Sequence, residues 1–557
     1  MQINNKSKAI RIKWDIWTAS TVICLLFFIL FMIYPLLKIF RLGSIKDGRF
    51  SLWYFIKFFN KKYYVNALLN SFAVAFSATF VTVIIGTILA YIMHTIKIAG
   101  KRITEIIIII TMLSPPFIGA YSWILLLGRN GVVTRFIKNI FGVTLPSIYG
   151  FRGMLIVFSL QLYPLIYLYV SGALRNMNKS LFEAAESLGC AGTKRFFKVV
   201  LPLLAPMLLS GAVLVFMRSM ADFGTPQLIG EGYRTMPYLV YNEFISEVGG
   251  EDGFAAALSV IMVVITLLFF LLQKYIALKM SFTMTANKTV EPTVYRGLKN
   301  LAAHVFVYVI AFLGLLPQLT VTYTAFQKTS ASGRMFMPGY SLNSFKIAFQ
   351  KLGNCLVNTY IFSVLAVLLI VVIGVFIAYL TIRRASPITN LLDTMTMVAY
   401  IIPGSVMGIA LLLGFNRKPF MLVGSTFIML LAYILRRMPY TIRSSVAILS
   451  GIHPSVEEAA VSLGASNITT FGKIVLPMML PGVLSGAILS WMTIISELSA
   501  TVLLYVKKTE TLTIAIYTEV IRSNYGTAAA LSVILTFSTV TVLLLFFKLS
   551  KNSRITI

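Results

Sequence analysis

Two carboxylates stand at equivalent places in a repeated sequence, and they are the side chains best suited to chemistry. Asp222 lies in MRSMADFGTP and Glu497 lies in IISELSATV, 275 positions further on. Ionisable groups within or near a membrane usually mark a pathway for a solute. The alternative is a hydrogen bond at a helix end or between helices. An i,i+4 pair with Arg218 would account for Asp222 only, because the position equivalent to Arg218 holds Thr493.

Other reactive residues predict no catalysis and no bound cofactor. No G-x-x-x-x-G-K-[ST] sequence occurs in the chain, so we expect it to lack a phosphate-binding loop and to make or break no covalent bond. The cysteines and histidines share no metal-ligand spacing, so we predict neither a metal site nor a disulfide framework. These residues are Cys24, Cys190, Cys355, His94, His304 and His453.

A longer, amphipathic repeat predicts a point of attachment for another protein. EAAESLGCAGTKRFFKVVLPLLAP (183–206) and EAAVSLGASNITTFGKIVLPMMLP (458–481) share twelve of 24 residues. Glu, Ala and Leu favour a short helix, which Gly189 or Gly464 ends. Pro202 and Pro477 are then expected to open the next helix, where a missing N–H is tolerated. The adjacent alanines and the matched glutamate predict a docking helix, used twice by a twofold partner.

The composition places these residues in a membrane protein. Hydrophobic residues make up 58% of the 557 residues and charged residues only 12%, too apolar for a soluble chain of this length. A membrane-spanning helix needs about 20 mostly apolar residues, and charges interrupt such runs. Twelve runs satisfy this condition: Ile16–Leu37, Tyr63–Met93, Ile106–Gly128, Gly153–Leu174, Val199–Met217, Gly253–Gln273, Leu301–Gln327, Leu352–Ile382, Thr394–Asn416, Pro419–Leu435, Ile474–Ser496 and Ser523–Phe547.

The net charge of +30 predicts contact with lipid rather than with nucleic acid. The basic residues are scattered between the apolar runs and form no stripe, so attraction to anionic lipid headgroups explains them better. An even number of spans places both termini on one side of the membrane. Basic residues near both ends favour the cytoplasmic side: Lys6, Lys8, Arg11, Lys13, Lys548, Lys551 and Arg554.

The repeat extends over most of the chain. NALLNS at Asn66 matches NCLVNT at Asn354, and the same offset of 288 relates Gly86 to Gly374 and Tyr91 to Tyr379. Further along the chain the offset falls to 275, so the first half contains 13 residues that the second half lacks. We assign these additional residues to the loop 129–149. We therefore predict an all-α, polytopic membrane protein with two parallel six-helix repeats. The first unit is 1–287 and the second is 288–557, with a pathway between them.

The repeated loop resembles the EAA loop of the membrane permeases of binding-protein-dependent ABC importers. In that family the loop carries a coupling helix that sits in a cleft of the ATPase subunit. The resemblance implies two copies of a cytoplasmic ABC ATPase, which bind the ATP and Mg²⁺, an external solute-binding protein, and a place in the bacterial cytoplasmic membrane. It assigns coupling to Glu183, Ala184, Ala185, Gly189, Glu458, Ala459, Ala460 and Gly464.

Shorter stretches of the sequence indicate which solute is transported. The fused twelve-helix layout, with ADFGT, SELSAT and TLTIAIY, resembles the ferric-iron permeases, and a carboxylate pair suits a cation such as Fe³⁺. Permeases for thiamine, aminoethylphosphonate and polyamines share features of this pattern and stay as alternatives, and an ion-driven carrier is the competing class. A further matched pair, Glu243 and Glu519, lies in external segments that are predicted to face the binding protein.

Overall fold

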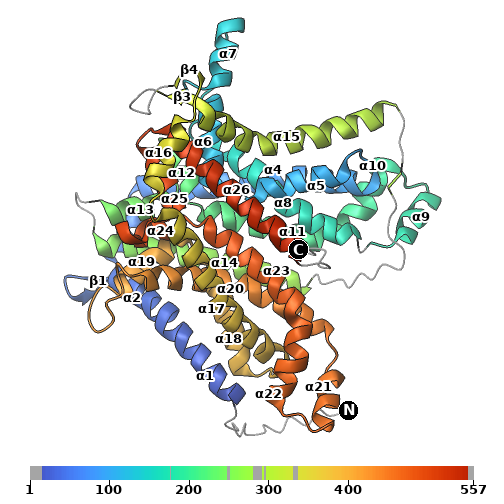
Figure 1. Cartoon of the computed structure of the whole chain (residues 1–557), viewed down its shortest axis with the longest axis vertical. Coiled ribbons are helices and arrows are strands. Elements are labelled where there is room, and N and C mark those ends of the chain that lie inside the picture. Colours follow the sequence, from blue (N-terminus) through green and yellow to red (C-terminus); the bar gives the residue numbers. More distant parts are fainter. Residues whose placement is uncertain are drawn as a thin grey trace. The chain divides into compact units, whose positions relative to one another are not determined.

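Helices make up most of the residues that a computed structural model of the chain describes (Figure 1). The structure describes residues 16–113, 115–175, 177–246, 251–279, 292–293, 297–329 and 336–549. The predicted boundary between the two sequence units falls outside these residues. So do Lys6, Lys8, Arg11, Lys13, Lys551 and Arg554, from which cytoplasmic termini are predicted.

The first sequence half contains the elements up to α14. They are α1 (Ile16–Phe28), η1 (Ile29–Ile33), α2 (Tyr34–Gly43), β1 (Ile45–Lys46), β2 (Arg49–Phe50), α3 (Trp53–Asn60), α4 (Lys62–Thr95), α5 (Lys101–Leu113), α6 (Pro116–Leu127), α7 (Val132–Phe141), α8 (Phe151–Arg175), α9 (Lys179–Ser187), α10 (Gly192–Arg195), η2 (Phe196–Val200), α11 (Leu201–Ala221), α12 (Gly224–Ile229), α13 (Met236–Ile245) and α14 (Asp252–Lys279).

The second half repeats most of this order. Its elements are α15 (Leu298–Phe326), β3 (Gln327–Thr329), β4 (Phe336–Tyr340), α16 (Asn343–Leu352), α17 (Cys355–Arg383), α18 (Pro387–Ile401), α19 (Gly404–Gly414), α20 (Thr426–Gly451), α21 (Ser455–Ser462), α22 (Asn467–Thr470), η3 (Phe471–Val475), α23 (Leu476–Ile495), α24 (Thr501–Leu504), η4 (Lys507–Thr509), α25 (Leu512–Ile521) and α26 (Tyr525–Leu549). The described strands form two antiparallel hairpins, β1 with β2 and β3 with β4.

The length and composition of the helices confirm an all-α, polytopic membrane protein. Within the described residues, nine helices are long and apolar enough to cross a membrane, and two bent pairs raise the number to eleven. Each pair, α5 with α6 and α18 with α19, breaks beside a proline, Pro115 or Pro403. Proline lacks the N–H that a continuous helix needs, so the break occupies the same place in both halves.

Helix α20 departs from the predicted span Pro419–Leu435, which is wrong at both ends. The helix begins at Thr426 and continues to Gly451, because Arg436 and Arg437 lie within it and do not end it. The residues on either side of them, Leu435 and Met438, are fully buried. The protein rather than lipid surrounds this part of the helix, which is the usual setting of an arginine at membrane depth.

A π-helical turn precedes the first proline of α11 and of α23. Pro202 and Pro477 lie in the first turns of α11 and α23, as expected. The continuous helical path nevertheless begins earlier, at Gly192 and Asn467. The turns η2 and η3 occupy matched positions five residues long, directly before the α-helices that carry the prolines. A π turn changes the hydrogen-bond spacing by one residue, so it accommodates a proline that cannot donate.

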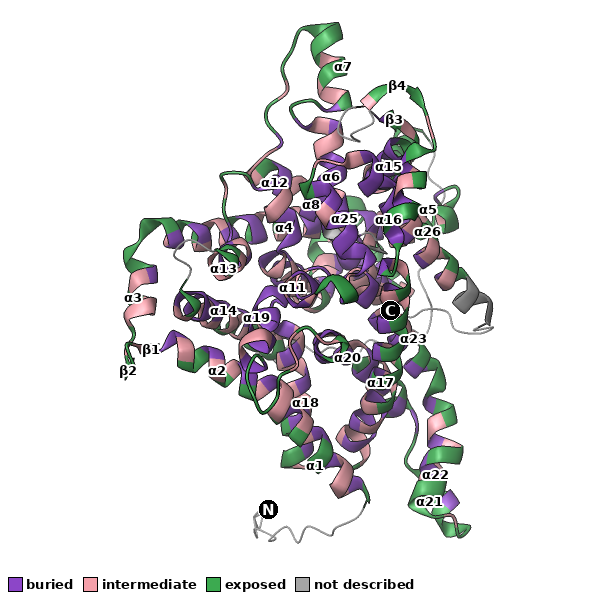
Figure 2. Cartoon of the chain, turned by 60° about the vertical axis from the view of Figure 1, so that its left-hand side comes forward, coloured by how far each residue is buried: buried purple, intermediate pink, exposed green. Residues whose placement is uncertain are grey.

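Contacts divide the chain into two compact units that differ from the sequence halves. Unit 1 comprises Met1–Leu37, Ser363–Tyr400 and Tyr433–Ile494, and unit 2 comprises Lys38–Phe362, Ile401–Ala432 and Ile495–Ile557. In unit 1, α1 of the first half packs with helices of the second half. In unit 2, α15 of the second half packs against α5 and α6 of the first half, and against α26 (Figure 1). Within unit 2, buried residues are frequent in α8 and α25 (Figure 2).

Matched glycines make the same helix contacts in both units. In unit 2, a Cβ added to Gly86 of α4 would lie 2.7 Å from Ile166 Cβ, and one added to Gly211 of α11 would lie 2.9 Å from Ile166 Cδ1. In unit 1 the equivalent residue is Thr441. A Cβ on Gly374 would lie 3.4 Å from its Cγ2, and one on Gly486 would lie 2.6 Å from its Cα. Small residues allow helices to approach closely in membranes, so the sequence repeat is also a packing repeat.

The additional residues of the first half contain an exposed helix. α7 lies in the predicted external loop, and none of its residues is buried. Phe136, Ile140 and Phe141 are 60%, 58% and 69% exposed. The helix ends at Gly142, whose φ of +66° places it in the left-handed region.

Candidate functional site

The first repeated loop, residues 183–206, begins within the capped helix α9. The Asn178 side chain accepts a hydrogen bond from Ser180 N, which satisfies one N–H of the first turn. At the other end, Cys190 N donates to Ala185 O over 2.8 Å, and Gly189 has a φ of +72°. This is a Schellman cap, and it requires the left-handed conformation that glycine adopts most easily.

The second loop, residues 458–481, has the same cap geometry. Ser455 N donates to the His453 Nδ1 atom over 3.2 Å, so histidine takes the place of Asn178. Ala465 N donates to Ala460 O over 3.0 Å, and Gly464 has a φ of +90°. The predicted short helix that ends at glycine is therefore present in both copies.

The two helices present matched exposed faces. In Figure 2, α21 and α22 are mostly exposed. Ala185 and Ala460 each face inward and are 6% exposed, whereas the other predicted coupling residues are exposed. Leu188 and Leu463 are 85% and 90% exposed, although leucine is usually buried. Sequence reasoning assigned these leucines only to helix formation, but their identity in both copies was a signal of a shared contact.

A contact between aromatic rings holds the first loop to α4, and an exposed ion pair joins α9 to α10 within the loop. Phe182 is buried, and the Arg195 guanidinium lies 4.9 Å from its ring centroid. Arg195 Nη1 lies 3.4 Å from Glu186 Oε2, and the Glu186 side chain is 66% exposed. The Tyr91 and Phe196 rings are 4.7 Å apart.

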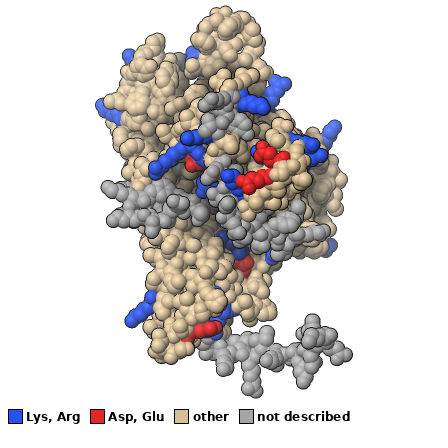
Figure 3. Space-filling model, turned by 90° about the vertical axis from the view of Figure 1, so that its right-hand side faces the viewer, with Lys and Arg blue, Asp and Glu red and all other residues tan. Residues whose placement is uncertain are grey.

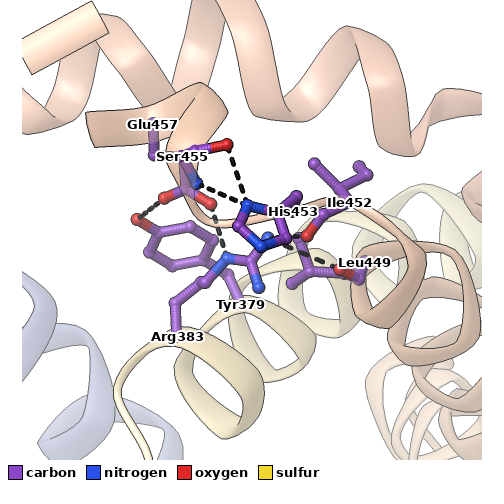
Figure 4. A network of polar contacts seen from close by, with 7 residues as sticks. All are labelled: Tyr379, Arg383, Leu449, Ile452, His453, Ser455 and Glu457. Atoms are coloured by element: carbon purple, nitrogen blue, oxygen red, sulfur yellow. Dashed lines mark hydrogen bonds and ion pairs between the residues drawn. The ribbon is translucent and has the colours of Figure 1, made fainter. Parts of the chain in front are cut away.

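The second loop is held by a largely buried polar network (Figure 4). Arg383 Nε donates to Glu457 Oε1 over 2.5 Å, and the Tyr379 hydroxyl donates to Glu457 Oε2 over 3.0 Å. Arg383 Nη2 also donates to Ile452 O over 2.6 Å, near the end of α20. The side chains of Arg383 and Glu457 are only 12% and 15% exposed.

The carboxylates Asp222 and Glu497 have equivalent hydrogen bonds within unit 2. Asp222 Oδ2 accepts from Thr225 N over 2.9 Å, and Glu497 Oε1 accepts from Ala500 N over 3.1 Å. Each carboxylate thus binds the backbone N–H three residues further on, at the start of a short helix. The two segments also meet, because a Cβ on Gly224 would lie 3.3 Å from Leu498 Cδ2.

An aromatic cluster lies beside these carboxylates. The Phe223 ring is 4.3 Å from the Tyr241 ring and 6.4 Å from the Tyr517 ring. Tyr241 and Tyr517 thus both pack against Phe223. The offset of 276 that relates Glu243 to Glu519 also relates these tyrosines. Sequence reasoning missed them, although the signal was present.

The repeated motif NALLNS and NCLVNT fixes α13 and α25, which carry these tyrosines. Ser71 Oγ accepts from Met236 N, the first residue of α13, over 2.7 Å. Thr359 Oγ1 likewise accepts from Leu512 N, the first residue of α25, over 2.8 Å. The preceding asparagines, Asn70 and Asn358, donate to the carbonyls of Arg234 and Glu510. The motif therefore joins α13 to α4 and α25 to α17.

The glutamates predicted to contact a binding protein have partners within the chain. Glu243 Oε1 accepts from the Tyr64 hydroxyl over 3.1 Å. Glu519 is 5% exposed and pairs with Lys351 Nζ over 2.8 Å and with Arg522. Both residues thereby fasten α13 and α25 to neighbouring helices of unit 2.

The described residues contain no evident metal site, and their surface charges are scattered. Among them, no group of three or more His, Cys, Asp or Glu side chains is arranged to hold a metal ion. On the face in Figure 3, lysine and arginine lie in separate groups, and the acidic side chains gather in a few places beside them. This distribution resembles the scattered pattern of the sequence rather than a continuous basic stripe.

The helices, the two capped loops and the matched segments α13 and α25 define a polytopic membrane protein built by duplication. The family described as binding-protein-dependent transport system inner membrane component matches residues 82–282 and 370–554. The chain belongs to this family and is a permease component of a transport system. The family occurs once in each half, as the repeat predicts.

Individual relatives cover most of the chain. It is 28% identical to the ferric transport system permease protein FbpB of Actinobacillus pleuropneumoniae, over 98% of this chain and 79% of the relative. It is 27% identical to a putative ferric transport system permease protein of Haemophilus influenzae, over 88% and 78%. A putative 2-aminoethylphosphonate permease protein of Salmonella typhimurium is 26% identical, over 42% of this chain and 82% of that protein.

Proposed function

We propose that this chain forms the membrane pathway of an ATP-driven importer for ferric iron. The observation that carries the proposal is the similarity to a ferric transport permease over 98% of the chain. The duplicated fold and the two capped loops agree with the same function. Because selection would rest largely with the external binding protein, the pathway itself needs no tight metal site.

The two repeated loops would dock two copies of a cytoplasmic ABC ATPase. The exposed residues Glu183 and Glu458 offer one directional contact each, Ala184 and Ala459 permit close approach, and Leu188 and Leu463 supply apolar area. Ala185 and Ala460 would position the helices by packing inward. Gly189 and Gly464 would end them through their left-handed conformation. The ATPase subunits would bind ATP and Mg²⁺.

The external segments would form the gate of the pathway. Asp222 and Glu497 lie where equivalent segments of both halves meet, beside the rings of Phe223, Tyr241 and Tyr517. α13 and α25, which carry Glu243 and Glu519, would face the binding protein. Closure of the ATPase dimer would draw the loops together and open this gate, and hydrolysis would reset it.

Uptake of radiolabelled ferric iron tests the function. Cells that lack the chain are compared with cells that regain it, before and after depletion of ATP. Restored uptake that stops on ATP depletion is expected. Uptake that persists without ATP but stops when the ion gradients collapse would instead identify an ion-driven carrier. No restored uptake, with the protein present in the membrane, would refute iron as the solute.

Aminoethylphosphonate is the second candidate solute, because a permease with that name matches 42% of the chain. Thiamine and polyamines have only the sequence resemblance in their favour. Uptake of labelled aminoethylphosphonate in the same cells, with each unlabelled compound as competitor, separates these solutes. Uptake of the phosphonate that ferric iron does not inhibit would move the assignment to the phosphonate.

A further inference from the structure

The helix α7 of unit 2 has one apolar face and one polar face. At 3.6 residues per turn, all of its apolar residues fall on one half of the helix. The other half carries Thr134, Arg135, Lys138 and Asn139. None of the apolar side chains is buried, and the exposed surface continues beyond the end of the helix to Val143, which is 55% exposed.

The connection between α6 and α7 is closely packed, so the fold determines the direction of α7. Gly131 N donates to Gly128 O over 2.9 Å. A Cβ on Gly131 would lie 2.3 Å from Leu126 O, so a side chain would prevent this close approach. The Arg129 guanidinium lies 5.2 Å from the centroid of the Tyr149 ring, which joins the two ends of the loop that contains α7.

α7 runs across the direction of the spanning helices of unit 2. The path Phe117–Phe141, which contains α6 and α7, is bent by 102° from Lys101–Met112 of α5. α5 packs against α8 and α15, which are both long and apolar enough to cross a membrane. Figure 1 accordingly shows α7 crosswise to α15. A helix that crosses the spanning helices in this way lies along the membrane surface.

The length of α5 places α7 near one boundary of the bilayer. Lys101 and Arg102 open α5, and such charged residues mark the edge of the hydrocarbon region. The 13 residues of α5 rise about 20 Å at 1.5 Å per residue, whereas the hydrocarbon is about 30 Å thick. Because α6 and α7 leave the direction of α5 at its end, they lie within about the last third of this thickness.

Lipid at this depth would contact both faces of α7 at once. Exposed apolar surfaces that polar residues border mark contacts with a protein or with a membrane. In an interfacial helix, residues such as Phe136 and Ile140 enter the acyl chains, while Arg135 and Lys138 reach the phosphates. Among the described residues, no carboxylate pairs with either basic side chain. A soluble partner on the apolar face would leave both of them without a ligand.

We propose that α7 is a membrane-surface helix, with its apolar face among acyl chains and with Arg135 and Lys138 at the phosphates of anionic lipids. The inference depends neither on the solute nor on the docking of the two repeated loops. Within the described residues the second half has no counterpart, because no helix or strand lies between α19 and α20.

Spin labels on the two faces of α7 test the proposal through their depth in the membrane. Ile140→Cys places a label on the apolar face, and Arg135→Cys places one on the basic face as the matched control. Both changes are made in a Cys190→Ala chain, because Cys24 and Cys355 are buried and Cys190 is not. The full chain is held in nanodiscs of phosphatidylcholine and phosphatidylglycerol. Relaxation of each label by oxygen, which concentrates in acyl chains, is compared with relaxation by a water-soluble nickel chelate.

The two labels should give opposite results. Ile140 is 58% exposed, so its replacement removes little packing within the chain. We expect its label to be relaxed mainly by oxygen, about 5–10 Å into the boundary between headgroups and acyl chains. The Arg135→Cys label should be relaxed mainly by nickel. Relaxation of both labels mainly by nickel would place α7 in water and overturn the proposal. Protection of the Ile140→Cys label only after a binding protein is added would also overturn it, because the face would then belong to that protein.

A second measurement tests the basic face by itself. Arg135→Glu and Lys138→Glu are combined with the label on Ile140→Cys. In nanodiscs that contain phosphatidylglycerol, the label should move toward water, because attraction to anionic lipid becomes repulsion. In phosphatidylcholine alone the label should move less. An equal movement in both lipids would refute anionic phosphates as the ligands of these residues.

Discussion

Replacement of the two exposed leucines by serine tests whether the repeated loops bind ATPase subunits. Leu188 and Leu463 are 85% and 90% exposed, so the change removes almost no packing within the chain. Its effect on folding should stay within about 0.5 kcal/mol, as for other surface positions. Full burial of a leucine side chain by a partner contributes roughly 1.5–3 kcal/mol. The affinity for the ATPase should therefore fall roughly tenfold to 150-fold at each loop.

The assay titrates labelled ATPase subunits onto the purified permease held in nanodiscs. Leu298→Ser is the matched control, because Leu298 is 80% exposed at the start of α15 and lies outside both loops. The control should bind as the unsubstituted chain does. Binding of the Leu188→Ser/Leu463→Ser chain within twofold of the control would refute the reasoning, since the partner would then cover neither leucine.

Three further substitutions address the caps, the external segments and the carboxylates. Gly464→Ala should destabilise the folded loop by about 1–2 kcal/mol, because alanine is strained in the left-handed conformation. No steric clash adds to this cost, since no atom lies within 4 Å of the new Cβ. Unchanged thermal unfolding in detergent would contradict this expectation. Ser71→Ala leaves the buried N–H of Met236 without its acceptor at a cost of about 1–3 kcal/mol. Hydrogen exchange should then accelerate at the start of α13, and equal protection would count against the link. Glu497→Gln keeps an oxygen that can accept the hydrogen bond from Ala500 N, so thermal unfolding should be unchanged. Iron uptake should fall, because the negative charge is lost. Unchanged uptake would mean that the carboxylate serves only to cap the helix end.

The sequence predicted the class of fold and the existence of the repeat, because both follow from patterns among residues that are close together in the chain. Apolar runs identify spanning helices wherever charges interrupt them. The same rule failed at α20, where Arg436 and Arg437 lie inside a helix that the protein surrounds. The prolines at the starts of α11 and α23 were predicted correctly, but no local signal announced the π turn that precedes each of these helices.

The candidate functional site was likewise predictable from the sequence only in part. The capped helices with Gly189 and Gly464 followed from residues close together in the chain, and the structure forms them as expected. The roles predicted for Asp222 and Glu497 stay predictions, but their bonds to the backbone could not be foreseen from type and spacing alone.

The sequence by itself thus determined a twice-repeated helical membrane protein with two matched loops. Only the tertiary structure decided how the second loop is anchored. Arg383 and Glu457 stand 74 residues apart, and neither lies in the stretch that the repeat made conspicuous. A contact of that kind depends on which helix ends the folded chain brings together, whereas hydrophobicity, caps and repeats act over a few neighbouring residues.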